Sequence, residues 1–287
     1  MSELPYRTMS EREQYLFDLQ GFLVVEGLLC PSELQALNES LDANKDKEAE
    51  HGGRSTSPPL EGDRPRGHFH GMLTWDAPWS EPWRDLLAHA KLIPYLNTLF
   101  GRGWKLDHLP DVLTSARGAE GLTLHGFGNA TINGSRFYGY SNGTMRCGLI
   151  NCQFYLTDQL AGDGGLMVIP GSHKANLRPD DEILRWEAAQ EIAWHVPAKA
   201  GDLVIFNEAT THGTLPWTAD HERRVALYRY TPKYMHYTGG VFEASLPEWT
   251  TQLTQAQRAV LEPPYVYHRK LIEDDAETLA EPRREGE

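Results

Sequence analysis

The stretch AGDLVIFNEATTHGTLPWTADHERRVALYRYTPK, residues 200–233, decides the fold because it reads as a strand, a loop and a second strand. The run Leu203–Phe206 follows a Gly-Asp turn, is rich in β-forming residues and is too short for a helix, so we expect a buried strand. A second strand is expected at Val225–Tyr230, after a polar loop that contains His212. Two consecutive arginines precede it. A histidine at a strand end and a guanidinium on the facing strand together indicate a metal site beside a bound carboxylate.

The composition of the 287-residue chain limits the class of protein. Hydrophobic residues make up 40% and charged residues 23%, as in ordinary globular domains. No apolar run approaches the roughly 18–20 residues of a membrane helix, and the polar N-terminus lacks the pattern of a secretory signal. The net charge of −13 argues against a nucleic-acid polymer as partner. Three cysteines without a CxxC pair favour a reduced, cytoplasmic protein, so we expect a soluble enzyme without a membrane partner.

Upstream of the quoted stretch, short apolar runs recur between clusters of Gly, Asn, Asp and Ser. This spacing predicts a mainly β fold with flanking α-helices, as an all-β barrel or a double-sheet jelly roll. We expect a single domain over residues 1–287, with residues 1–103 mostly helical support, 104–235 the jelly-roll core and 236–287 a C-terminal extension. The expected strands before the quoted stretch are Trp104–Leu109, Leu122–His125, Met145–Thr157, Gly165–Pro170 and Ile192–Val196.

The first hundred residues carry helix signals around one strand. A capping-box sequence at Ser10–Glu13 predicts a helix that ends at Gly21, and the run Phe22–Val25 then reads as a strand. The charged, Gly- and Pro-rich segment Lys45–Arg66 cannot bury a core, so we expect a long loop. Further helices are expected from Pro31 to about Asn44, at Glu81–His89 and at Ile93–Phe100.

Six short segments of the chain resemble, in order, those of the phytanoyl-CoA dioxygenase family of iron(II)/2-oxoglutarate-dependent oxygenases. The resemblance covers roughly residues 15–235, and the set is more specific than any single piece. The matching segments are Gly21–Val25, Leu156–Leu166, Ile169–Lys174 (IPGSHK), Ala200–Phe206, His212–Gly213 and Arg223–Leu227. The resemblance implies a double-stranded β-helix, a jelly roll of the cupin kind, which agrees with the strand spacing.

The resemblance also implies a cofactor set and a role for each site residue. In this family two histidines and a carboxylate hold iron(II), and open positions take 2-oxoglutarate and then O2. His125 resembles the proximal iron ligand and His212 the distal one. Arg223 resembles the anchor for the distal carboxylate of 2-oxoglutarate, with Arg224 as the alternative because adjacent strand residues face opposite ways. The activity implied is oxidation, normally hydroxylation, of an unactivated C–H bond in a small-molecule substrate.

The sequence departs from the family at the metal-binding acid. The family motif is His-x-Asp, whereas this chain reads His125-Gly126-Phe127. In one interpretation another carboxylate completes the site, with Glu208 nearest in sequence to a ligand and Asp107 or Asp111 as alternatives. In a second, chloride occupies the open position and the enzyme is a halogenase. In a third, metal binding is lost and the jelly roll is a non-catalytic binding protein.

Other residues have a functional and an ordinary structural interpretation. Gln153 and Asn151 share one face of an expected strand and would donate to the cosubstrate, or they are ordinary barrel residues. Trp217 would form a wall of the site, or it packs in a core. The pair His68 and His70 is either a metal pair or a polar strand end. The loop aromatics Phe137, Tyr138 and Tyr140 are candidates for substrate contact. The substrate and the oligomeric state remain open.

Overall fold

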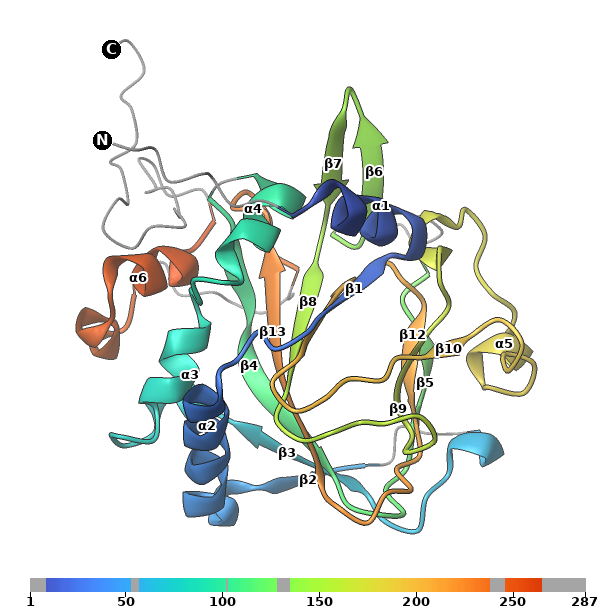
Figure 1. Cartoon of the computed structure of the whole chain (residues 1–287), viewed down its shortest axis with the longest axis horizontal. Coiled ribbons are helices and arrows are strands. Elements are labelled where there is room, and N and C mark those ends of the chain that lie inside the picture. Colours follow the sequence, from blue (N-terminus) through green and yellow to red (C-terminus); the bar gives the residue numbers. More distant parts are fainter. Residues whose placement is uncertain (1–8, 53–56, 102, 128–134, 238–245, 265–287) are drawn as a thin grey trace.

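Strand pairing around residues 200–233 builds the larger of two antiparallel sheets. The computed structural model describes residues 9–52, 57–101, 103–127, 135–237 and 246–264. In it β11 (Leu203–Asn207) lies between β1 (Phe22–Val25) and β8 (Ile150–Tyr155). The larger sheet has the order β1-β11-β8-β13-β4-β3-β2, and the smaller has the order β10-β9-β12-β5. The two sheets face each other, and β6 and β7 form a separate hairpin that projects from one end (Figure 1).

The remaining elements complete the two sheets and cover the larger one. The other strands are β2 (Ala49–His51), β3 (Arg66–His70), β4 (Lys105–Ser115), β5 (Leu122–His125), β6 (Tyr138–Ser141), β7 (Thr144–Cys147), β9 (Gly165–Val168), β10 (Trp194–His195), β12 (His212–Leu215) and β13 (Arg223–Thr231). The α-helices are α1 (Glu11–Gln20), α2 (Pro31–Ala43), α3 (Glu81–Leu86), α4 (Ile93–Phe100), α5 (Asp181–Leu184) and α6 (Gln255–Leu261). Helices α2, α3, α4 and α6 lie on the side of the larger sheet that faces away from the smaller one (Figure 1).

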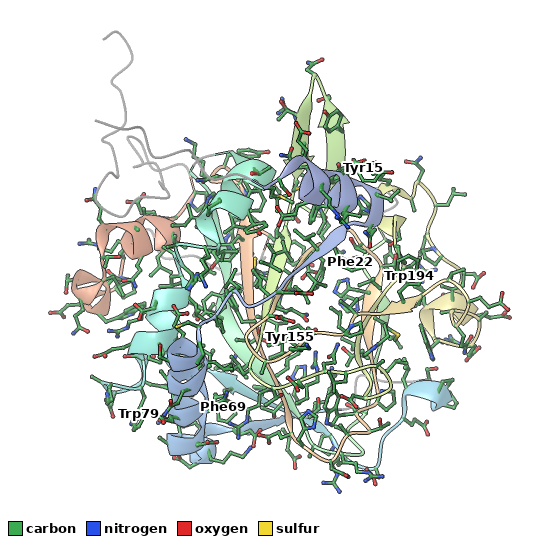
Figure 2. The ribbon with its side chains drawn as sticks, in the orientation of Figure 1. Tyr15, Phe22, Phe69, Trp79, Tyr155 and Trp194 are labelled. Atoms are coloured by element: carbon green, nitrogen blue, oxygen red, sulfur yellow. The ribbon has the colours of Figure 1, made fainter. Side chains whose placement is uncertain are left out.

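Alternate residues of the larger sheet enter two different cores. On β8, Cys152 and Phe154 belong to the core beneath the helices, whereas Tyr155 belongs to the core between the sheets. On β13, Leu227 faces the inter-sheet core and Tyr228 the helices. Figure 2 shows Tyr155 between the sheets. Because both faces are covered, β8 and β13 are buried along most of their length, and their barrel face also carries polar side chains, among them Asn151, Gln153 and Arg223.

The inter-sheet core closes the barrel. Leu166 and Val168 of β9 pack with Val204 and Phe206 of β11 across the gap between the sheets, and all four side chains are buried. Each such side chain contributes about 1.5–3 kcal/mol relative to exposure. The jelly-roll prediction, mainly β with flanking helices, is confirmed. Within the described ranges no helix is both long and apolar enough to cross a membrane.

The N-terminal predictions are largely confirmed. Ser10 and Glu13 form a reciprocal capping box at α1, and Gly21 ends the helix with a left-handed φ of 84°. Helix α4 has the predicted bounds, and α3 ends at Leu86, earlier than predicted. The first hundred residues also supply β1, β2 and β3 to the larger sheet.

Two local predictions are wrong. The segment Lys45–Arg66, predicted as a loop, contains two 3-10 turns and β2, which pairs with β3 through Ala49 and His68; residues 53–56 lie outside the described ranges. The aromatics Tyr138 and Tyr140 lie on β6, in a hairpin instead of a loop. Asn142 and Gly143 at its tip both have positive φ, the geometry of a two-residue hairpin turn.

Gly21 provides a test of how tightly α1 is held against the barrel. A Cβ at Gly21 would lie 2.5 Å from His173 Nδ1 and from Thr210 Oγ1, whereas a Cβ at Gly27 would meet nothing within 4 Å. Both glycines have positive φ. We expect Gly21→Ala to lower the free energy of unfolding by about 2–5 kcal/mol, because backbone strain and overpacking add. Gly27→Ala should cost only about 1–2 kcal/mol. Equal losses in denaturant titrations of the two variants would contradict this.

Candidate functional site

His125 and His212 lie side by side on adjacent strands of the smaller sheet. They are directly paired residues of β5 and β12, and their ring centroids lie 4.2 Å apart. The Nδ1 atom of His125 lies 3.0 Å from the Thr123 carbonyl oxygen, and that of His212 lies 2.7 Å from the Thr210 carbonyl oxygen. Since a carbonyl oxygen only accepts, each Nδ1 carries the hydrogen and each Nε2 keeps its lone pair. This is the tautomer that metal-binding histidines adopt.

Burial keeps both imidazoles neutral. It lowers the pKa of His125 to about 4, with a further contribution from His212. It also lowers the pKa of His212, against the opposing attraction of Glu208. Neutral imidazole is the form that binds a metal, so the pair is ready to ligate at neutral pH without first losing protons.

Glu208 is the carboxylate beside this pair. It follows β11, is 8% exposed, and places Oε2 3.6 Å from His212 Nε2. Its other oxygen accepts a hydrogen bond of 2.8 Å from the Asn151 amide and lies 3.5 Å from Arg229 Nε. Burial alone would raise the pKa of Glu208, but its interactions with His212, with the Arg229 guanidinium and with the Asn151 amide outweigh burial and lower the pKa below its ordinary value. The group is therefore an ionised oxygen donor.

Phe127 stands where the family has its acid, and it points elsewhere. Its φ is 81°, and its ring packs against the small core around Leu60 and Leu184, with the Arg178 guanidinium 5.5 Å from the ring centroid. Gly126 before it has a φ of 121°, and a Cβ there would lie 2.4 Å from the Thr210 carbonyl oxygen. The chain after β5 thus turns away from the histidines at Phe127, and Gly126 leaves room for the Glu208–Thr210 turn to approach His125.

The donor types suit iron(II), and their arrangement is partly preformed. In the described part of the chain, no three side chains of His, Cys, Asp or Glu lie together in a geometry ready to hold an ion. The two histidines are set by their carbonyl partners, whereas Glu208 is turned toward Asn151 and Arg229. Two imidazoles and one carboxylate are the ligand types of non-haem iron(II) oxygenases.

Arg223 lies in the same barrel interior. It is 3% exposed, its guanidinium carbon lies 6.0 Å from the Tyr155 ring centroid, and its Nε donates to Gln159 Oε1 at 2.8 Å. Gly165 of β9 lies beside its Nε, and His212 pairs with Val168 of the same strand. Three residues along a strand span about 10 Å. A bound dicarboxylate would therefore bridge the histidines and the guanidinium lengthwise.

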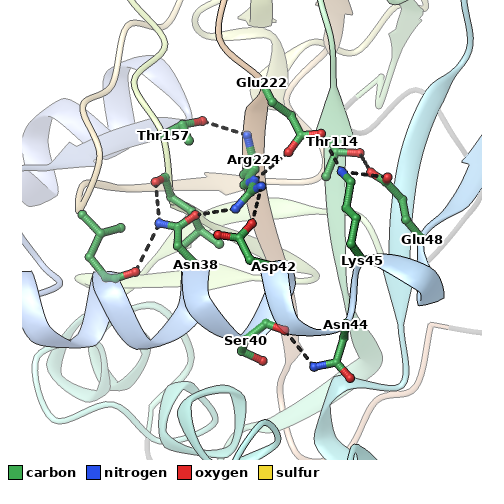
Figure 3. A network of polar contacts seen from close by, with 12 residues as sticks. Asn38, Ser40, Asp42, Asn44, Lys45, Glu48, Thr114, Thr157, Glu222 and Arg224 are labelled. Atoms are coloured by element: carbon green, nitrogen blue, oxygen red, sulfur yellow. Dashed lines mark hydrogen bonds and ion pairs between the residues drawn. The ribbon is translucent and has the colours of Figure 1, made fainter.

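Arg224 lies on the opposite face of β13 and binds helix α2 (Figure 3). Its guanidinium pairs with Asp42 and with Glu222, each at 2.7 Å, and donates to Asn38 at 3.2 Å. The structure therefore does not bring Arg224 together with the histidines. Of the two consecutive arginines, Arg223 faces the barrel.

The other predicted residues are divided between the site and its surroundings. Gln153 lies on the barrel face of β8 between Asn151 and Tyr155, whose hydroxyl donates to its amide oxygen at 3.3 Å. Trp217 is fully buried with its Nε1 donating to the His221 carbonyl, and nothing places it beside the histidines. Asp111 pairs with Arg229 at 3.0 Å.

Asp107 and the remaining histidines have other neighbours. Asp107 lies 3.5 Å from Lys105 Nζ and 3.0 Å from His108 Nδ1. The rings of His68 and His70 on β3 are tilted relative to each other, with centroids 4.3 Å apart. His173 is fully buried and its Nε2 donates to the Asp18 carbonyl at 3.0 Å.

Sequence reasoning missed Arg229 and Gln159. Arg229 ion-pairs with Glu208 and Asp111 and so links the turn after β11 to β4. In the sequence it reads as one more residue of an expected strand, and only its even-numbered spacing from Arg223 and Leu227 places it on the barrel face. Gln159 lies in a turn-like segment with no residue pattern that marks it.

A cavity of about 640 Å3 lies against the start of β4 in the larger sheet. It is lined by the start of β4 and by segments near α6, and its walls include Leu73, Leu109 and Trp249 beside Lys105, His108 and His236. His108 is the register partner of Arg229, which lies next to Glu208. One residue of the cavity wall therefore pairs directly with the strand position of Arg229.

Comparisons with known proteins give one family match and several structural matches. The family model described as phytanoyl-CoA dioxygenase (PhyH) matches residues 17–225. HygX from Streptomyces hygroscopicus, solved with nickel and 2-oxoglutarate, superposes with a TM-score of 0.65 at 20% identity, covering 83% of this chain and 93% of HygX. The carbocyclase SnoK from nogalamycin biosynthesis superposes with a TM-score of 0.61 at 17% identity. The match covers 90% of this chain and 94% of SnoK.

A third similar structure also contains 2-oxoglutarate. EctD from S. alaskensis, solved with 2-oxoglutarate and 5-hydroxyectoine, gives a TM-score of 0.56 at 19% identity, covering 79% of this chain and 78% of EctD. At these identities the superpositions establish the fold. A search of the curated proteins finds no match.

The direction of Phe127 gives a test of the missing acid. Because its side chain leaves the site, we expect Phe127→Asp not to raise the affinity for Ni2+ or iron(II), measured anaerobically by calorimetry. The same variant should lower the free energy of unfolding by about 1–3 kcal/mol through lost packing. Phe127→Leu, which keeps an apolar side chain, is the control and should cost less. A metal affinity raised tenfold by the aspartate would show that position 127 reaches the ion.

Proposed function

The chain belongs to the phytanoyl-CoA dioxygenase family, and from this we propose that it is an iron(II)- and 2-oxoglutarate-dependent oxygenase that hydroxylates a C–H bond of a small molecule. The observation that carries the proposal is the paired His125 and His212, whose Nε2 lone pairs are fixed by carbonyl partners in the same barrel that buries Arg223. A binding protein without metal or cosubstrate would have no need of all three.

We propose Glu208 as the third metal ligand in place of the family's aspartate. It is ionised, buried and 3.6 Å from His212 Nε2, and it arrives on the turn that carries His212. Iron(II) bound there, with 2-oxoglutarate and O2, would supply the oxidising power, with succinate and carbon dioxide as the other products. Arg229 and Asn151 hold Glu208 and limit its rotation.

The other residues bind, orient and exclude water. Arg223 would bind the distal carboxylate of 2-oxoglutarate through its guanidinium fork. Gln153 lies between Asn151 and Tyr155 on the barrel face of β8, and its amide would donate a hydrogen bond to the cosubstrate. The apolar side chains of the inter-sheet core, among them Phe206 with its ring 4.6 Å from that of His212, keep water from the reacting atoms.

We propose the 640 Å3 cavity as the place of the substrate. Its volume lies within the usual range for small-molecule sites. Its walls combine apolar side chains with the polar side chains of Lys105, Asp107, His108 and His236. This combination suits a compound with an apolar body and a hydrogen-bonding end. HygX and EctD were solved with hygromycin B and 5-hydroxyectoine, both small molecules.

Halogenation is the alternative, with chloride as the third ligand. It is favoured by one observation: among the described residues no carboxylate stands in ready geometry with both histidines. Phe127 does not oppose it, because its ring packs away from the site. The two activities differ in whether Glu208 or a halide completes the metal site.

Anaerobic reconstitution tests the proposal. Iron(II) and 2-oxoglutarate should give the weak visible charge-transfer absorption of the chelated cosubstrate. We expect His125→Gln and His212→Gln to abolish it, and Arg223→Gln to weaken 2-oxoglutarate binding by about tenfold or more. The control Arg224→Gln, on the opposite face of β13, should leave the band unchanged.

The same titration separates the two activities. Glu208→Gln should weaken iron(II) binding by at least about tenfold if Glu208 is a ligand, and chloride should not move the band. A band that shifts with chloride and is indifferent to Glu208→Gln would establish the halide site instead. Absence of any band, with His125→Gln behaving like the parent protein, would mean a non-catalytic binding protein.

Leu109 and Leu177 allow a test of the cavity with unaltered folding. Leu109 is 70% exposed at the rim of the cavity, and Leu177 is 82% exposed elsewhere. Compounds that stimulate succinate formation are first found by screening. For such a compound, Leu109→Glu should raise KM several-fold, because a charge would border the apolar wall, whereas Leu177→Glu should not. Equal KM values for the two variants would place the substrate outside this cavity.

A further inference from the structure

Gln159 is a fully buried residue whose side chain holds Arg223. Its backbone exchanges two hydrogen bonds with Ala198, of 2.8 and 2.9 Å, in an isolated bridge between loops. Its amide oxygen accepts from Arg223 Nε at 2.8 Å and from the Leu166 backbone N–H at 3.2 Å. Its amide nitrogen donates to the Val196 carbonyl at 2.7 Å. These three contacts fix the orientation of the amide. A flipped amide would place its NH2 group against the N–H donors of Arg223 and Leu166.

The chain makes room for this contact. Gly165 has a φ of 84°, and a Cβ there would lie 1.9 Å from Gln159 Oε1 and 3.1 Å from Arg223 Nε. Only glycine at this position lets the amide and the guanidinium meet. The contact therefore depends on three segments of the chain, which carry Gln159, Gly165 and Arg223.

The contact selects one edge of the guanidinium. Arginine has five N–H donors, and one of them, on Nε, is used by Gln159. The edge that remains for a bidentate partner is the one formed by the two terminal nitrogens, and the Tyr155 ring lies against the same group. A carboxylate bound end-on to that edge would lie in line with the Arg223 side chain.

We propose that Gln159 is a positioning residue that fixes which edge of Arg223 meets the distal carboxylate of the cosubstrate. This inference rests on the proposed 2-oxoglutarate-dependent function. Gln159 does not touch the cosubstrate; it acts through Arg223. An apolar side chain at 159 would leave Nε buried without an acceptor, and a glutamate would compete with the cosubstrate for the guanidinium.

The experiment compares two 2-oxo acids on metal-loaded protein. Calorimetry without O2 gives the Kd values of Ni2+-loaded protein for 2-oxoglutarate and for 2-oxopentanoate, which lacks the distal carboxylate. For Gln159→Met we expect the affinity for 2-oxoglutarate to fall about tenfold or more and that for 2-oxopentanoate to stay within about twofold. The Kd for Ni2+ should also stay within about twofold. The control Gln190→Met changes an exposed glutamine and should alter none of these values.

A double-mutant cycle makes the outcome decisive. In an Arg223→Lys background, Gln159→Met should have no further effect on the ratio of the two Kd values, because the group it positions is gone. Gln159→Glu provides a second variant of nearly the same shape should the methionine variant fail to fold. Equal losses for both 2-oxo acids, or an unchanged ratio, would overturn the inference. If the parent protein binds 2-oxoglutarate no better than 2-oxopentanoate, the proposed function itself is wrong.

Discussion

The close approach between the end of β5 and the turn after β11 is the constraint on which the site depends. Gly126 leaves no room for a side chain beside the Thr210 carbonyl, and that same carbonyl fixes the tautomer of His212. One oxygen atom thus sets the spacing of two chain segments and the direction of one lone pair. Because Glu208 belongs to the same turn, its carboxylate comes within reach of the histidines without any contribution from position 127.

β13 joins this site to the rest of the molecule. Its barrel face presents Arg223 and Arg229 at opposite ends of the interior, one held by Gln159 and the other between Glu208 and Asp111. Its outer face sends Arg224 to helix α2. The two consecutive arginines therefore have unrelated tasks, because the pleat of a strand turns neighbours to opposite sides.

Much of the fold and half of the site could be predicted from the sequence. The capping box at Ser10 and the strand Leu122–His125 followed from local signals, and the expectation that His125 and His212 share a site followed from the resemblance to the family. The choice between Arg223 and Arg224 did not, since it depends on a register that a single sequence does not reveal. The direction of Phe127 depends on a left-handed backbone, and the roles of Arg229 and Gln159 arise only from contacts between distant segments.

The order of strands in the larger sheet bears on how the chain folds as it is made. β1 is synthesised early, yet its partner is β11, with Phe22 opposite Phe206, and His125 likewise meets His212 only after most of the chain has emerged. Such long-range pairings make folding slow and leave strand edges open in the meantime. Until β11 has been synthesised, the apolar strand β1 has no partner strand and stays exposed. We therefore expect the nascent chain to be prone to aggregation until β11 has paired with β1.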